Sequence, residues 1–142
     1  MTVTSKQCLD KYGDPHVEHN MAVFVCSPMI QSAIPKIPAH IYCNKDLFPH
    51  LGEALSLVVT RKLTAQIKTW DGCFNIRAKR DSTSQSLHSW GLAIDINASC
   101  NQLGCKPKMT MDLVRCFTDA GFEWGGSWHY PDGMHFQIAR LL

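Results

Sequence analysis

The sequence lacks three features that would each assign it to a specialised class of protein. It has no apolar run near the roughly 20 residues that a membrane-spanning helix requires. It has no dense Lys/Arg block, and its formal net charge is only +2, whereas a nucleic-acid-binding surface normally carries a basic stripe. It also contains no repeat or low-complexity tract. We therefore expect a globular protein, with 45% hydrophobic residues, that neither inserts into a membrane nor binds nucleic acid.

The N-terminal residues, MTVTSKQC, lack the apolar core of a secretory signal. We therefore expect synthesis in the cytoplasm, with no export signal in the chain itself. The length of 142 residues fits one domain, because domains most often contain roughly 100–150 residues. We expect a monomer formed by a single domain over residues 1–142.

The seven cysteines are an odd number, so a complete disulfide framework would leave one thiol unpaired. Most lie in apolar stretches such as Val23 to Cys26, where a free thiol packs as a small hydrophobic group. We expect reduced structural cysteines. Cys100 and Cys105 are the exception, since they can form a local disulfide or half of a metal site.

Hydrophobic periodicity and breaker residues predict the main elements. Five prolines divide the first fifty residues, which predicts loops with short strands at residues 22–26 and 40–43. Apolar residues at helical spacing predict a helix from Leu51 to Ile67 that ends by Asp71-Gly72. A second helix follows Thr110 as its N-cap and ends at Gly121.

Two segments alternate with a period of two residues, which is typical of strands. In residues 92–97 the apolar side chains share one face, and Asp95 lies on the other. In residues 135–138 the same rule separates Phe136 and Ile138 from His135. We predict an α+β domain with helices on one face of a small, mostly antiparallel sheet and a polar cleft on the other.

His88, Asp95 and His135 supply the donor types of a catalytic zinc site. Such a site has three protein ligands and an open fourth position, and it lowers the pKa of a water molecule to about 7. We therefore expect one zinc ion bound by these residues. Read alone, Asp95 would be a solvated strand residue.

The remaining candidate residues would act on a substrate. Asp132 precedes His135 by three residues and could act as a general base, or it could only shape the turn at Pro131-Asp132-Gly133. Arg77 could stabilise an oxyanion or pair with a substrate carboxylate, or it could be an ordinary surface charge. Trp128 and His129 could line the substrate cleft, although tryptophan is equally common in cores.

These motifs resemble the D-alanyl-D-alanine carboxypeptidase family of zinc peptidases, whose members share the Hedgehog/DD-peptidase fold. The string from Ser86 through His88 and Gly91 to Asp95, followed by Asp132-x-x-His135-Phe136, is similar to the family signature. The likeness covers about residues 70–138 and is greatest to small members from bacteriophages. It implies zinc ligation by His88, Asp95 and His135, the base role for Asp132, a substrate or oxyanion contact for Arg77, and support of the substrate site by Ser86.

The sequence departs from many members of this family in having Asp-x-x-His rather than Glu-x-x-His at Asp132 and His135. This variant resembles the L-alanyl-D-glutamate endopeptidases of phage endolysins. The resemblance implies cleavage within peptidoglycan stem peptides, at the cell wall, after release from the cytoplasm or from a virion. A D-Ala-D-Ala carboxypeptidase and a non-catalytic zinc-binding wall-binding module are the alternatives.

Overall fold

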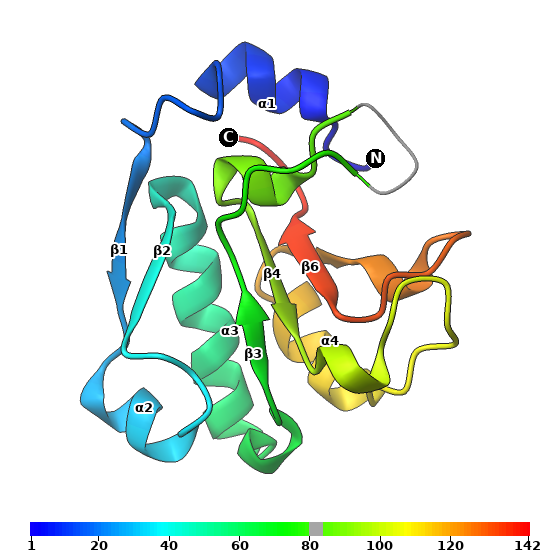
Figure 1. The fold of residues 1–142 in the computed structure, drawn as a ribbon. Helices are drawn as coiled ribbons and strands as arrows, with labels where there is room; N and C mark the ends of the chain where they lie inside the picture. The colour runs from blue at the N-terminus through cyan, green and yellow to red at the C-terminus, as the bar shows by residue number, and fades with distance from the viewer. Residues whose placement is uncertain (80–83) are drawn as a thin grey trace.

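A computed structural model describes residues 1–79 and 84–142 as an α+β protein, as predicted (Figure 1). Its described residues form four α-helices and two antiparallel sheets. The helices and strands are α1 Ser5–Tyr12, β1 Met21–Val25, α2 Pro28–Ala33, β2 His40–Asn44, α3 Phe48–Thr60, β3 Trp70–Gly72, β4 Ala93–Ile96, α4 Met111–Thr118, β5 Phe122–Trp124 and β6 His135–Ile138.

The larger sheet has the strand order β3-β4-β6-β5, and every neighbouring pair is antiparallel. Strands β4 and β6 pair so that Asp95 lies directly opposite His135 and Ile94 opposite Phe136. Directly opposed residues in an antiparallel pair project from the same face of the sheet. The register therefore places Asp95 and His135 side by side on one face.

The other face of this sheet packs against helices, as predicted. The ring of Phe117 on α4 lies 4.6 Å from the ring of Phe136 on β6, measured between centroids. A second contact joins Phe117 to Phe122 on β5 at 5.7 Å. Helix α3 lies beside α4 (Figure 1). Because side chains alternate along β6, the face that carries His135 is turned away from α4.

The structure confirms the predicted second helix, α4. The Thr110 side chain accepts a hydrogen bond from the backbone N–H of Leu113, which makes it the N-cap. The helix ends at Thr118, and Gly121 follows with a positive φ of 98°. The apolar face of α4 is thereby fixed toward the sheet.

The first predicted helix, residues 51–67, has different bounds in the structure. Helix α3 begins at Phe48, with Pro49 in its first turn, and ends at Thr60. Lys62 adopts a positive φ of 60°, and a short 3-10 helix, Thr64–Gln66, follows. Ile67 is nevertheless buried, so the apolar periodicity continues beyond the helix itself. The predicted end at Asp71-Gly72 is wrong, because these residues belong to β3.

The prediction for the first fifty residues is right for the strands and wrong for the helices. Strands β1 and β2 form an antiparallel pair close to the expected positions. The prediction missed α1, where Thr4 and Gln7 form a reciprocal capping box, and α2, where Ser27 caps the helix and Pro28 lies in its first turn. Proline is compatible with the first helical turn, since the N–H that it lacks has no helical partner there.

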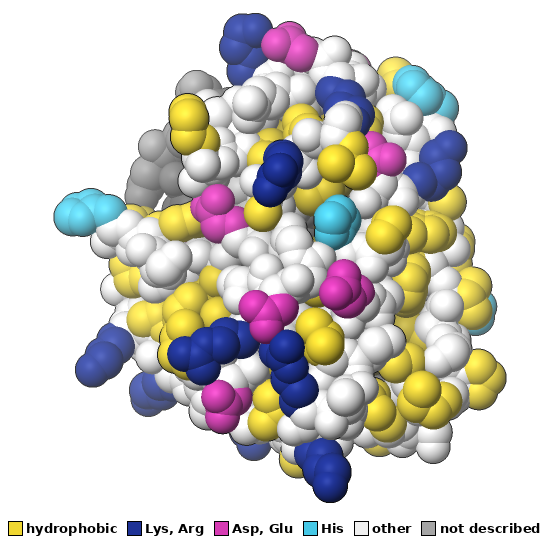
Figure 2. Space-filling model, turned by 180° about the vertical axis from the view of Figure 1, so that it is seen from behind, with side chains coloured by type: hydrophobic (Ala, Val, Ile, Leu, Met, Phe, Trp, Pro, Cys, Tyr) yellow, Lys and Arg dark blue, Asp and Glu magenta, His cyan; other side chains and the backbone are white. Residues whose placement is uncertain are grey.

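The face opposite to the view of Figure 1 carries charged side chains of both signs (Figure 2). Lys and Arg side chains are interspersed there with Asp and Glu. Throughout the described part of the chain, the helices are too short or too polar to cross a membrane. Five cysteines are buried, whereas Cys100 and Cys105 are exposed.

Candidate metal centre

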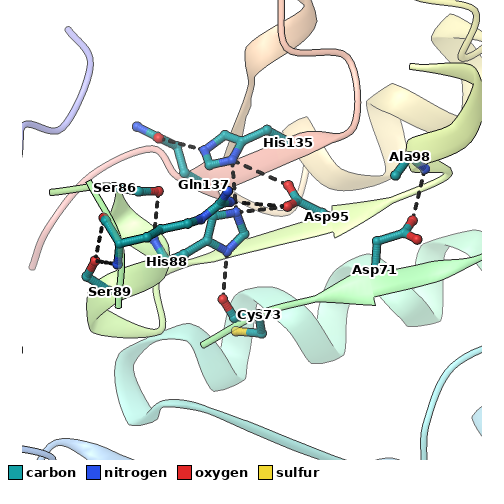
Figure 3. Close-up of polar contacts among 10 residues, drawn as sticks. Asp71, Cys73, Ser86, His88, Ser89, Asp95, Ala98, His135 and Gln137 are labelled. Carbon is teal, nitrogen blue, oxygen red and sulfur yellow. Dashed lines mark hydrogen bonds and ion pairs between the residues drawn. The ribbon is translucent and has the colours of Figure 1, made fainter. Parts of the chain in front are cut away.

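Three buried side chains from separate elements meet on the face of β4 and β6 that is turned away from α4 (Figure 3). Asp95 comes from β4, His135 from β6, and His88 from a short 3-10 helix, Leu87–Trp90. One ligand atom from each residue lies within 4.8 Å of the others. The Ser86 side chain caps the 3-10 helix by accepting a hydrogen bond from the His88 backbone N–H at 3.3 Å. Sheet register and this cap together hold the cluster.

The ligand atoms that face one another in the cluster lie closer together than 4.8 Å. His135 Nδ1 lies 3.2 Å from His88 Nε2. His88 Nε2 lies 3.1 Å from Asp95 Oδ2, and His135 Nδ1 lies 3.5 Å from Asp95 Oδ1. Two imidazole nitrogens and a carboxylate therefore converge on one small volume.

Each histidine has a hydrogen-bond partner for its other ring nitrogen. His88 Nδ1 lies 2.6 Å from the carbonyl oxygen of Cys73, and His135 Nε2 lies 2.9 Å from Gln137 Oε1. Both oxygens are acceptors, so these ring nitrogens are the donors. In the neutral rings, His88 Nε2 and His135 Nδ1 then carry lone pairs and no proton.

This donor set fits a divalent metal ion. Two lone pairs and a carboxylate repel one another unless a cation or a proton lies between them. Asp95 Oδ1 is buried without a hydrogen-bond partner among the described residues. Zinc accepts imidazole nitrogen and carboxylate oxygen, and its histidine ligands usually donate their second N–H to a carbonyl or a similar acceptor. His88, Asp95 and His135 can therefore hold such an ion.

Electrostatic coupling within the cluster is strong because it is buried. Burial raises the pKa of Asp95, but hydrogen bonds and charge from His135 and His88 outweigh it and hold that pKa well below its usual range. Burial lowers the pKa of His135, but the hydrogen bond and charge of Asp95 outweigh it, so that pKa is raised. In the absence of a metal ion, Asp95 thus favours the protonated form of His135.

A cavity of about 430 Å³ opens beside the cluster and is lined by most of the predicted site residues. It brings Asp95 and His135 together with four of them: Arg77, Ser86, Trp128 and Asp132. Arg77 Nη2 lies 3.6 Å from Asp95 Oδ2, and its side chain is about half exposed, at 47%. A substrate in the cavity would therefore meet a cation next to the candidate metal ligands.

Asp132 lies in the turn before β6, where two backbone hydrogen bonds hold it. Its N–H donates to the carbonyl of Gly125 at 2.8 Å, and its carbonyl accepts from the N–H of His135 at 3.2 Å. Asp132 Oδ1 is buried, and the described residues provide it with no hydrogen-bond partner. Burial raises the pKa of Asp132, and the charge of Asp95 adds to this. His135, His88 and Arg77 oppose the shift only in part.

Two neighbouring tryptophans, Trp124 and Trp128, lie in different surroundings. Trp128 lines the cavity, and its ring lies 5.4 Å from the ring of His135. Its Nε1 donates to Glu123 Oε2 at 2.6 Å, which fixes its orientation. Trp124 instead stacks on Phe136. His129 is exposed and is not one of the residues that line the cavity.

Two residues that contact the histidines were not among the predicted site residues. Gln137 is 3% exposed and contacts His135, and the backbone carbonyl of Cys73 contacts His88. Strand alternation could have indicated Gln137, because it is two residues after His135 and shares its face. No sequence signal indicates a contact from the backbone carbonyl of Cys73, the residue that follows β3. Other residues that the prediction did not include line the cavity: Thr2, Lys79, Leu103 and Tyr130.

Comparison with protein families supports the resemblance found in the sequence. Residues 80–138 match a family model described as D-alanyl-D-alanine carboxypeptidase. This range, somewhat less than half of the chain, contains His88, Asp95, Asp132 and His135, whereas Arg77 precedes it. A search of curated proteins finds no matching relative. The part of the chain that contains His88, Asp95 and His135 is thus similar to the D-alanyl-D-alanine carboxypeptidase family of peptidases.

Proposed function

We propose that this protein is a zinc-dependent peptidase that hydrolyses peptide bonds in the stem peptides of peptidoglycan. The observation that carries the proposal is the buried convergence of His88 Nε2, Asp95 and His135 Nδ1 beside a cavity that is lined by Asp95, His135 and Asp132. The family match supports the peptidase chemistry. We further propose one zinc ion for each monomer and a role at the cell wall.

His88, Asp95 and His135 would hold the metal ion. When bound, zinc supplies Lewis acidity, which polarises a carbonyl group and acidifies water. The hydrogen bonds from His88 to Cys73 and from His135 to Gln137 would keep both rings in the orientation and tautomer that binding requires. The buried surroundings would limit access of bulk water to the ligands.

Asp132 would act as the general base and then as the general acid. Its carboxylate would take a proton from the attacking water and later give that proton to the leaving amine. The raised pKa of Asp132 supports this role, because a carboxyl group with a higher pKa holds the transferred proton more readily. Its position on the cavity wall, three residues before His135, is consistent with the proposal.

Arg77 and Trp128 would contact the substrate. The guanidinium group of Arg77 can stabilise an oxyanion or pair with a substrate carboxylate. Trp128 provides an aromatic wall whose ring is fixed by Glu123. Ser86 would act indirectly, since it caps the short helix that carries His88. Because it lies outside the cavity lining, the role of His129 stays a prediction without structural support.

We favour an endopeptidase of the L-alanyl-D-glutamate type over a carboxypeptidase. The basis is the Asp-x-x-His form of the motif at Asp132 and His135, which resembles that of phage endolysins. Such an enzyme would reach the wall after release from the cytoplasm or as part of a virion. A carboxypeptidase would remove a terminal D-alanine instead, so the products distinguish the two.

The test is a digest of purified muropeptides with product analysis by mass spectrometry. We expect zinc-loaded protein to release fragments cut between L-alanine and D-glutamate, and a chelator to abolish the reaction. Loss of only a terminal D-alanine would identify the carboxypeptidase. Cleavage that survives chelation, or tight wall binding without any product, would contradict the proposed function.

A further inference from the structure

Gln137 contacts His135 on the side away from the other two candidate ligands (Figure 3). Both residues belong to β6 and are two positions apart, so their side chains project from the same face. Gln137 is 3% exposed, and its Oε1 lies 2.9 Å from His135 Nε2. The amide therefore lies against a single ring nitrogen, on a residue that also lines the cavity.

Within the described part of the chain, the NH₂ group of Gln137 has no hydrogen-bond partner. Its Nε2 is buried, and no described residue accepts a hydrogen bond from it. A glutamine amide can present either an acceptor oxygen or a donor NH₂ group to the same neighbour. Because Nε2 has no other partner, the contact with His135 decides which group faces the ring.

The two amide orientations require different tautomers of neutral His135. With the oxygen toward His135, the ring carries its proton on Nε2 and presents a bare Nδ1 to His88 and Asp95. With the NH₂ group toward His135, the ring must accept at Nε2 and carry its proton on Nδ1. That proton would occupy the position of the metal ion, so only the first state can bind metal.

The two histidines differ in how their tautomers are fixed. The partner of His88 is the backbone carbonyl of Cys73, which can only accept a hydrogen bond. His88 Nδ1 is therefore the donor irrespective of any side-chain substitution. The partner of His135 is a side chain that can donate or accept. Substitution of Gln137 should therefore change the affinity for the metal ion through the tautomer of His135, without affecting that of His88.

We propose that Gln137 is a positioning residue that selects the metal-binding tautomer of His135 and thereby sets the affinity of the site for zinc. This role rests on the proposed zinc site and does not require that the substrate be peptidoglycan. A carboxylate at the same place can only accept, so it fixes the competent tautomer and makes the ring a stronger base. A methionine of similar length forms neither hydrogen bond.

The test compares Gln137→Glu and Gln137→Met in equilibrium zinc titrations against a chromophoric chelator, without any substrate. We expect Gln137→Glu to bind zinc at least as tightly as the wild type. We expect Gln137→Met to bind about 10- to 100-fold more weakly, the usual effect of losing an outer hydrogen bond to a metal ligand. The same methionine substitution at the exposed Gln102 serves as a control and should leave zinc affinity unchanged.

A spectroscopic measurement separates positioning from general damage to the fold. In ¹⁵N NMR spectra of the zinc-loaded wild type and Gln137→Glu, His135 should carry its proton on Nε2, and that proton should exchange slowly with water. In Gln137→Met the proton should exchange faster, while thermal unfolding of the metal-free protein should remain cooperative. Wild-type zinc affinity in Gln137→Met, or weaker binding in both variants, would overturn the proposal. Absence of muropeptide cleavage by the wild type would contradict the proposed function alone.

Discussion

At the scale of single residues, the buried carboxyl group of Asp95 and the half-buried one of Asp132 line the same cavity and have pKa values shifted in opposite directions. Asp95 stays ionised because hydrogen bonds and charge from two histidines outweigh the effect of burial. Burial and the negative charge of Asp95 raise the pKa of Asp132. Opposite shifts of neighbouring groups are typical of sites where one carboxylate binds a cation and the other transfers protons.

Substitution of Asp132 should separate metal binding from turnover. We expect Asp132→Asn to retain zinc, because the side chain is not one of the three convergent ligands. Hydrolysis should fall by about 10²- to 10⁴-fold, the usual contribution of a general base. Zinc content by mass spectrometry and initial rates on muropeptides measure the two effects.

An exposed aspartate provides the matched control for Asp132. Asp112 lies in the first turn of α4, away from the cavity. Asp112→Asn should keep both zinc and activity. If Asp132→Asn hydrolysed muropeptides at a rate near that of the wild type, Asp132 would not be the general base.

Zinc binding should strengthen with rising pH. In the metal-free protein the pKa of His135 is raised above its ordinary value of 6.5 by Asp95, and the metal must displace this proton. Below that pKa, each step toward acid protonates His135 further and weakens binding. Above that pKa, His135 is neutral, so a further rise in pH no longer strengthens zinc binding through this residue. Competition titrations between about pH 6 and about pH 8, where histidine titrates, measure the effect.

The convergence of His88, Asp95 and His135 agrees with the residues predicted from the sequence, but their hydrogen-bond partners could not be predicted. Alternation places Asp95 and His135 on the polar face of their strands. The carbonyl of Cys73 reaches His88 only because β3 pairs with β4 in the folded chain. A backbone group carries no signal in the sequence, so this contact requires the structure.

At the scale of elements, a close approach between two parts of the chain positions the helix of His88. Gly91 ends this short helix with a positive φ of 66°. A Cβ atom at Gly91 would lie 2.7 Å from the backbone nitrogen of Asn44 in β2. The two backbones are joined here by a hydrogen bond from Asn44 N–H to the Gly91 carbonyl at 3.1 Å.

Substitutions at Gly91 should therefore destabilise the protein and disturb the site. We expect Gly91→Ala to lower the free energy of unfolding by at least about 1–3 kcal/mol, the usual cost of overpacking. Gly91→Asn is the informative comparison, because asparagine tolerates positive φ but still adds a Cβ atom. Both variants should unfold at lower denaturant concentration. A near-normal Gly91→Asn would show that backbone conformation alone requires glycine there.

Element boundaries were less predictable than element types. Helix α4 was predictable because Thr110, the apolar face and Gly121 all indicate the same limits. Helix α3 ends earlier than its periodicity indicates, since Leu63 and Ile67 pack inward from non-helical backbone. Helix α2 could not be predicted from the rule that proline breaks helices, because Pro28 lies in its first turn, where proline is tolerated.

At the scale of the whole molecule, the N-terminal and C-terminal halves share one hydrophobic core. Buried residues from α1, β2 and α3 contribute to it together with those of β4, α4 and β6. Cys8, Cys26, Cys43, Cys73 and Cys116 are part of this core. Thus the residues that precede the family match also support the site.

Thiol labelling should show that the cysteines of this shared core are inaccessible in the native protein. Burial raises the pKa of Cys8 to about 12, so its thiol is protonated and inaccessible near neutral pH. We expect a thiol reagent to modify only Cys100 and Cys105 in the native protein and all seven cysteines after unfolding. Mass spectrometry of labelled peptides identifies the sites. Rapid native labelling of Cys8 or Cys43 would contradict the described packing.

Reconstitution of the metal-free protein tests the central claim most directly. Zinc is added stepwise to chelator-treated protein while bound metal and muropeptide hydrolysis are measured in the same samples. We predict that hydrolysis is absent at the start, rises in proportion to bound zinc, and reaches its limit at one ion per chain, with His135→Ala failing to respond. Full hydrolysis by the metal-free protein, or zinc binding that restores no hydrolysis, would contradict this account.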